Sequence, residues 1–117
     1  MHIQVTAAAF FFAFLPLSGY TQDTVPKTTE EARKQFEAAD AELNRIYTRC
    51  VVGETVQSQV TLQQAQRIWV QYRDLNAAAY QTGESSRHRT DDNYYFYART
   101  ILTRSRINEL KALFYNQ

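Results

Sequence analysis

The sequence has few of the residues on which several protein classes depend. Its 117 residues include one Cys, two Pro and three Gly. A single Cys excludes an intrachain disulfide framework and a Cys-based zinc site. The scarcity of Gly and Pro argues against a turn-rich all-β fold, which needs these residues at its many turns. The length suits one domain.

An excess of charge of one sign is also missing. Thirteen Lys and Arg oppose twelve Asp and Glu, for a net charge of +1. Nucleic-acid-binding domains normally show a strong basic excess, so we expect no nucleic-acid partner. No charged side chain precedes Asp23, which divides the chain into an uncharged N-terminal segment and a charged remainder.

The uncharged segment has the pattern of a secretory signal peptide. Residues 3–17 are almost wholly apolar, and Pro16 and Gly19 stand at the end of the run. The run is shorter than the roughly 20 residues that a transmembrane helix needs, and no Cys stands near the expected cleavage site to carry a lipid anchor. We predict cleavage after Thr21, with cleavage after Gly19 or an uncleaved N-terminal anchor as alternatives. The prediction gives a signal peptide at 1–21, a single helical domain at 22–117, a periplasmic or secreted location, and no stable membrane insertion after cleavage.

The charged remainder has the pattern of a helical protein. Thr28 with Glu31 forms a capping box at the start of a first helix, and Gly53 ends it. Ser58 or Thr61 could begin a second helix, and Thr61 is favoured because Gln64 completes a box. Apolar residues at helical spacing define the expected core faces. In the first helix these are Ala32, Phe36, Ala39, Leu43, Ile46, Tyr47 and Cys50; in the second they are Leu62, Ala65, Trp69, Tyr72, Asn76 and Ala79, widened by Ile68 and Leu75.

A third helix, capped by Thr90 or Asp91, is predicted to run to about Tyr115. Its apolar residues fall on two faces, so it is either kinked near residues 103–105 or packed on different neighbours. The predicted fold class is all-α, a small antiparallel bundle of three main helices with a fourth short one allowed. The two faces are Tyr94, Ala98, Ile101 and Leu102, and Ile107, Leu110, Leu113 and Phe114.

Candidates for catalysis are few. His88 has no Ser, Asp or Cys at a recognisable catalytic spacing, and no Gly-rich phosphate loop exists. Cys50 lies on the apolar face of the first helix, which favours a buried, inert thiol over a Cys50–His88 dyad. We therefore expect no catalytic residue, no cofactor, no metal and no enzymatic activity. A thiol enzyme, in which Cys50→Ser abolishes activity, is the alternative.

The densest group of notable residues is 66–74. Trp69 and Tyr72 lie side by side on a helix and are typical core anchors. Arg73 and Asp74 point in different directions, so we expect each to reach a neighbouring helix instead of pairing. Arg73 could bind a carboxylate of the first helix, such as Asp40.

Three motifs in this order resemble the lysozyme inhibitor LprI family, particularly its N-terminal domain. They read AADAELNRIY at 38–47, AQRIWVQYRD at 65–74 and LTRSRINEL at 102–110. Many members have Cys where this chain has Ala77 and Ala98, so the bridge that would clamp both ends of the following loop is missing. The resemblance implies an exported, helical, non-enzymatic inhibitor of lysozyme, a peptidoglycan muramidase. The matched residues, which we expect to be largely structural, are Asp40, Leu43, Asn44, Tyr47, Gln66, Trp69, Tyr72, Arg73, Asp74, Thr103, Arg106, Glu109 and Leu110.

A polar loop predicted at 81–92 is the candidate partner-binding segment. Lysozyme works with two carboxylates in a cleft, and basic and hydrogen-bonding groups could pair with them there. Residues 87–111 carry six basic and three acidic side chains, so this half would attract an acidic partner. A solvated connector is the simpler interpretation of the loop. The candidate residues are Ser85, Ser86, Arg87, His88 and Arg89.

Two other functions fit the same sequence. One is a periplasmic immunity protein against a secreted toxin that attacks the cell wall. The other is an envelope accessory protein with no enzyme target. The aromatic run at 94–97 bears on the second, because four consecutive aromatic residues point around a helix and at least one should be exposed. An exposed aromatic residue can mark an interface.

Overall fold

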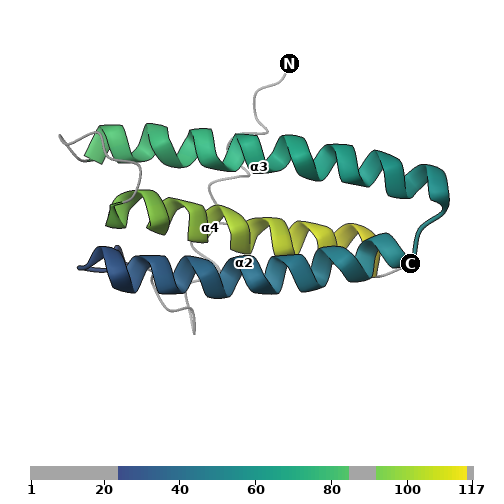
Figure 1. The fold of residues 1–117 in the computed structure, drawn as a ribbon, viewed down its shortest axis with the longest axis horizontal. Coiled ribbons are helices and arrows are strands. Elements are labelled where there is room, and N and C mark those ends of the chain that lie inside the picture. The colour runs from purple at the N-terminus through teal and green to yellow at the C-terminus, as the bar shows by residue number, and fades with distance from the viewer. Residues whose placement is uncertain (1–23, 85–91, 116–117) are drawn as a thin grey trace, which may run out of the picture.

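The computed structural model describes residues 24–84 and 92–115, and in these ranges the chain forms helices and no strand. The helices are α2 (Thr29–Val52), α3 (Val56–Glu84) and α4 (Asn93–Leu110), and α4 continues into a single π-helical turn, η2 (Lys111–Tyr115). Consecutive helices run antiparallel (Figure 1). The predicted all-α bundle of three main helices is confirmed. The predicted signal peptide lies outside the described residues.

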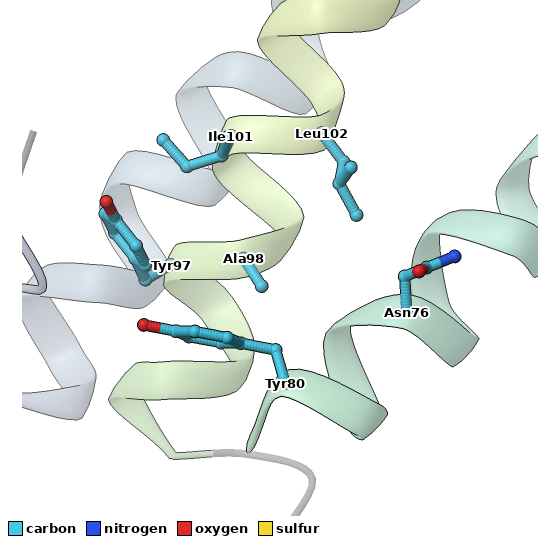
Figure 2. A pocket seen from close by; sticks show the side chains of 6 residues that line it. All are labelled: Asn76, Tyr80, Tyr97, Ala98, Ile101 and Leu102. Carbon is cyan, nitrogen blue, oxygen red and sulfur yellow. The ribbon is translucent and has the colours of Figure 1, made fainter. Parts of the chain in front are cut away.

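Helix α4 is the middle element of the bundle. It packs against both α2 and α3, whereas α2 and α3 make little direct contact (Figure 1). One side of α4 buries Thr100, Thr103, Ile107 and Leu110. Another side, with Ala98 and Leu102, borders α3 (Figure 2). The two apolar faces of α4 therefore pack against two different neighbours. This was the second of the two alternatives that the sequence left open.

The helix starts agree with the sequence in one case out of three. The Thr28 hydroxyl accepts a hydrogen bond from the Glu31 amide at 3.1 Å, as predicted, and Gly53 follows the last residue of α2. The predicted start at Ser58 or Thr61 is wrong. Helix α3 begins at Val56, where the Thr55 hydroxyl accepts from the Ser58 amide at 3.2 Å.

Thr61 lies inside α3, and its hydroxyl donates to the carbonyl of Gln57 at 3.1 Å. A Thr can bond backward in this way within a helix, so a Thr–x–x–Gln pattern does not by itself mark a start. The cap of α4 is Asp92, whose Oδ1 accepts from the Tyr95 amide at 2.9 Å. Asp92 thus replaces the predicted Thr90 and Asp91, which lie outside the described residues.

The apolar core lies between the second half of α2 and the end of α4. All the residues predicted for the core face of α2 are buried except Tyr47, which is partly buried and packs against the cluster. Leu62 is the contribution of α3 to this cluster. No helix in the described ranges is both long enough and apolar enough to cross a membrane. The cluster comprises Leu43, Ile46, Cys50, Leu62, Ile107 and Leu110.

The predicted core face of α3 is right for Leu62, which is buried, and for Trp69, which packs against the core cluster, but it is wrong for the other residues. Ile68, Tyr72 and Leu75 are 66%, 52% and 72% exposed, respectively. Besides Leu62, the helix buries Arg73, Ala77 and Gln81, none of which was predicted to face the core. Apolar spacing alone favours burial of Ile68, Tyr72 and Leu75. Polar side chains can nevertheless be buried at low cost when groups on other helices form hydrogen bonds with them. The partners of Arg73 and Gln81 therefore decide which side of α3 faces inward.

The aromatic run at 94–97 does not leave a side chain exposed, contrary to expectation. All four residues are half-buried. Phe96 packs on Phe36 of α2 with ring centroids 6.1 Å apart, and Tyr80 of α3 contacts both Tyr94 and Tyr97 at 6.2 Å. Because α4 is the middle helix, its first turns have neighbours on both sides.

Candidate functional site

Arg73 joins the three helices at the centre of the bundle. Its side chain is only 5% exposed, and its Nη1 donates to Asp40 Oδ1 of α2 at 3.2 Å. Its Nε donates to the neighbouring Asp74 Oδ1 at 2.8 Å, and the same oxygen accepts from Arg99 Nε of α4 at 3.0 Å. We call Asp40, Arg73, Asp74 and Arg99 the Arg73 cluster.

The cluster confirms one sequence prediction and corrects another. Arg73 does bind Asp40. The expectation that Arg73 and Asp74 do not pair is wrong, because the long Arg side chain can turn beside its own helix and bring Nε to the next carboxylate. The side chains of Asp40 and Asp74 are 37% and 36% exposed, so water reaches both carboxylates, whereas the Arg73 side chain is almost completely buried.

Aromatic rings surround the two guanidinium groups of the cluster. Phe36 contacts both of them, with the Arg99 guanidinium carbon 3.9 Å and the Arg73 guanidinium carbon 5.1 Å from its ring centroid. Arg73 also lies 5.2 Å from the Trp69 ring, and Arg99 lies 5.0 Å from the Tyr95 ring. Cations attract the faces of aromatic rings, most strongly when water is excluded. Trp69 is thus an anchor for cations as well as for the core.

A second polar group joins α3 and α4 about two helical turns from the Arg73 cluster, at Gln66 of α3 and Arg106 of α4. Arg106, whose side chain is 10% exposed, donates through Nε to Gln66 Oε1 at 3.0 Å. Its Nη1 donates to Glu109 Oε1 at 2.5 Å, and its guanidinium lies 5.8 Å from the Trp69 ring. Gln66, Trp69, Arg106 and Glu109 therefore form one connected group.

A third group holds α3 and α4 together at the other end. Gln81 is 1% exposed, and its Nε2 donates to Oδ2 of the buried Asp92 at 3.4 Å. Tyr80 packs on the rings of Tyr94 and Tyr97 beside this contact. The adjacent Asn93 donates to the carbonyl of Pro26 at 2.8 Å, which attaches the segment preceding α2.

The first two of these groups contain seven of the thirteen motif residues that the sequence singled out. The family model described as lysozyme inhibitor LprI matches residues 19–110. The chain belongs to the lysozyme inhibitor LprI family. No curated protein sequence and no solved structure gives a significant match.

Not all of the LprI motif residues lie in these groups. Leu43, Thr103 and Leu110 are buried in the bundle, and the Thr103 hydroxyl has no hydrogen-bond partner in the described part of the chain. Tyr47 packs against the core, and burial raises the pKa of its hydroxyl, which Arg67 and Arg106 partly oppose. Asn44 and Tyr72 are exposed.

The Gln81–Asp92 contact lies near Ala77 and Ala98, the two positions at which the family resemblance implied a missing disulfide. Ala77 is fully buried on α3, and Ala98 lies at the border of α3 and α4 (Figure 2). Gln81 and Asp92 lie nearer than this Ala pair to the two ends of residues 85–91. The hydrogen bond and the Tyr80 contacts therefore tie the flanks of that segment together without a covalent link.

The predicted partner-binding residues, Ser85, Ser86, Arg87, His88 and Arg89, all lie outside the described residues. The predicted loop was too long at its start, because residues 81–84 belong to α3. The sequence reasoning also missed Arg99, Gln81 and Asp92. Arg99 could have been found from its spacing, since it precedes the motif residue Arg106 by two helical turns.

The thiol of Cys50 is buried, as predicted, and it is free. Its Sγ lies 3.9 Å from the carbonyl oxygen of Leu110. Burial raises the pKa of the Cys50 thiol, and Glu54 adds to the effect. This environment disfavours the reactive thiolate. Across residues 24–84 and 92–115, no three His, Cys, Asp or Glu side chains come together as metal ligands.

Proposed function

We propose that this LprI-family chain is an exported, non-enzymatic protein that inhibits lysozyme or a related peptidoglycan-degrading enzyme. The single observation that carries the proposal is the family match, which covers residues 19–110. The uncharged N-terminal segment supports export, and the match begins close to the expected cleavage site after Thr21. A periplasmic or extracellular location would bring the protein to such enzymes.

The inhibitory segment in this proposal is residues 85–91. Lysozyme has two carboxylates in its cleft, and Arg87 and Arg89 can offer charge-assisted hydrogen bonds to them. His88 can add a further donor. Ordering a segment on binding opposes affinity, and that cost falls when its ends are already held. The Gln81–Asp92 contact supplies such an attachment, and this supports placing the segment at the enzyme.

The proposal is tested by a lysozyme turbidity assay with the wild-type protein and two double variants. Arg87→Ala/Arg89→Ala removes both cations of the segment. Lys34→Ala/Arg45→Ala is the matched control, because it removes two cations from exposed positions of α2. We expect the wild type and the control to inhibit and the segment variant to lose at least about tenfold in potency, the equivalent of one charge-assisted hydrogen bond.

The possible results separate the enzyme target from the binding segment. A wild-type protein that slows none of a panel of lysozymes refutes the lysozyme target. Equal inhibition by all three proteins retains the target and refutes the role of residues 85–91. Equal loss in both variants means that general positive charge, and not this segment, attracts the enzyme.

A further inference from the structure

One side of α3 carries apolar residues that the rest of the bundle leaves uncovered. Ile68, Tyr72 and Leu75 are each more than half exposed. With Ala65 and Ala79 they follow one another at alternating intervals of three and four residues. This spacing draws a straight line along a helix and is typical of the seam between two paired helices. We call these five residues the α3 stripe.

The α3 stripe continues into the border with α4. A hollow of about 280 Å3 lies there between Asn76 and Tyr80 of α3 and Tyr97, Ala98, Ile101 and Leu102 of α4 (Figure 2). A neighbouring hollow of about 230 Å3 is lined by Tyr72, Trp69 and Leu102, among others. Because Tyr72 belongs to both the stripe and this second hollow, the apolar surface extends from α3 onto α4.

The exposed face of α3 is nearly free of charge. Between residues 57 and 82 the charged residues are Arg67, Arg73 and Asp74, and the last two are engaged in the Arg73 cluster. Gln64 and Gln71 flank the stripe. A strongly acidic or basic partner would find little attraction here, whereas two copies of the same face would meet without like-charge repulsion.

We propose that the α3 stripe binds the α3 stripe of a second copy of this chain, with the two helices antiparallel. A two-fold axis between positions 71 and 72 sets Ile68 of one copy opposite Leu75 of the other. It also sets Arg67 opposite Asn76, whose amide oxygen can accept a hydrogen bond from the cation. Each contact then occurs twice, as a symmetric dimer requires. A parallel pair would instead bring the two Arg67 residues to the same level.

The dimensions of the surface predict a weak dimer. With 29 residues, α3 is about 43 Å long, and a contact strip about 10 Å wide would cover about 400 Å2 on each copy. The two copies together then bury about 800 Å2, which is below the usual range for specific, stable interfaces. We therefore expect dissociation in the micromolar range and a dimer that forms only as the protein is concentrated.

Sedimentation velocity tests the dimer. The wild-type protein should shift from the monomer mass to twice that mass between about 1 and about 300 µM. Ile68→Ser/Leu75→Ser should remain a monomer. Val52→Ser/Val56→Ser is the matched control, because it also replaces two exposed aliphatic side chains, 73% and 78% exposed, away from the stripe. Circular dichroism should show equal helix content in all three proteins.

A wild-type protein that stays monomeric refutes the proposal, as does a dimer that persists in the Ile68→Ser/Leu75→Ser variant. If the protein is monomeric and this variant loses lysozyme inhibition, the stripe binds the target enzyme instead of a second copy. The dimer proposal does not depend on the proposed inhibition, so failure of either leaves the other standing.

Cysteine cross-linking tests the direction of the two helices. Gln71→Cys lies beside the proposed axis and should form an intermolecular disulfide under mild oxidation. Ala65→Cys is distant from its own copy in the antiparallel pair, and it should not cross-link. Efficient cross-linking of Ala65→Cys refutes the antiparallel arrangement. The native Cys50 is buried and gives little background.

Discussion

Replacing Arg73 by Ala should destabilise the protein far more than the loss of an ordinary surface cation. The change removes two charge-assisted hydrogen bonds, to Asp40 at 3.2 Å and to Asp74 at 2.8 Å. Each such bond contributes about 1.5 to 3 kcal/mol. The carboxylates are about one-third exposed, so water can replace part of what they lose, and the lower value applies. The two bonds together give about 3 kcal/mol.

The cation–aromatic contacts to Phe36 and Trp69 are lost as well, and the space left by the Arg side chain adds to the cost. We therefore take about 3 kcal/mol as a lower estimate, which agrees with the cost of removing one partner of a buried ion pair. With a denaturant slope of about 1.5 kcal/mol per molar urea, the unfolding midpoint should fall by about 2 M. Arg73→Lys keeps the charge but cannot donate to both carboxylates with the geometry of a guanidinium. We expect it to reduce stability by about half as much as Arg73→Ala.

The measurement is urea unfolding followed by circular dichroism at the helix band. Arg33→Ala is the matched control, because Arg33 also pairs with two carboxylates, those of Glu30 and Glu37, but its side chain is 41% exposed. Exposed pairs of this kind contribute at most about 1 kcal/mol. If Arg73→Ala lowers the midpoint no more than Arg33→Ala does, then the Arg73 cluster does not hold the three helices together.

Three further changes test other contacts. Gln81→Ala should lower the free energy of unfolding by about 1 kcal/mol. It should also speed hydrogen exchange at the Tyr95 amide, which donates its hydrogen bond to Asp92. Unchanged exchange at that amide would refute the role of Gln81 in holding Asp92. Oxidised Ala77→Cys/Ala98→Cys should form a bridge closing a loop of about 20 residues and gain about 3 kcal/mol; free thiols by mass spectrometry would refute it. Because the folded protein raises the pKa of Cys50 above 9.0, the neutral thiol stabilises the fold most below that pH and less as the pH rises through the folded-state pKa. The melting temperature of the wild type should therefore fall relative to Cys50→Ala between about pH 8 and about pH 11, and a constant difference would contradict the buried thiol.

Several features could be predicted from the sequence because they depend on neighbouring residues. The Thr28 cap, the end of α2 at Gly53 and the buried face of α2 follow from local hydrogen bonds and one continuous apolar face. The binding of Arg73 to Asp40 was also predicted, from the expectation that Arg73 reaches a carboxylate on a neighbouring helix. The candidate segment at 85–89 could be proposed only from its chemistry, and its role stays a prediction.

The sequence by itself determined that this protein is a bundle of three helices and which side of α2 is buried. Only the tertiary structure decided which side of α3 faces inward. That helix has one side with Ile68, Tyr72 and Leu75 and another with Arg73, Ala77 and Gln81, and apolar spacing favours the first. Asp40, Asp92 and the ring of Phe36 satisfy the polar side from other helices. Such partners are distant in sequence, so the choice depends on interactions that exist only after the helices have assembled.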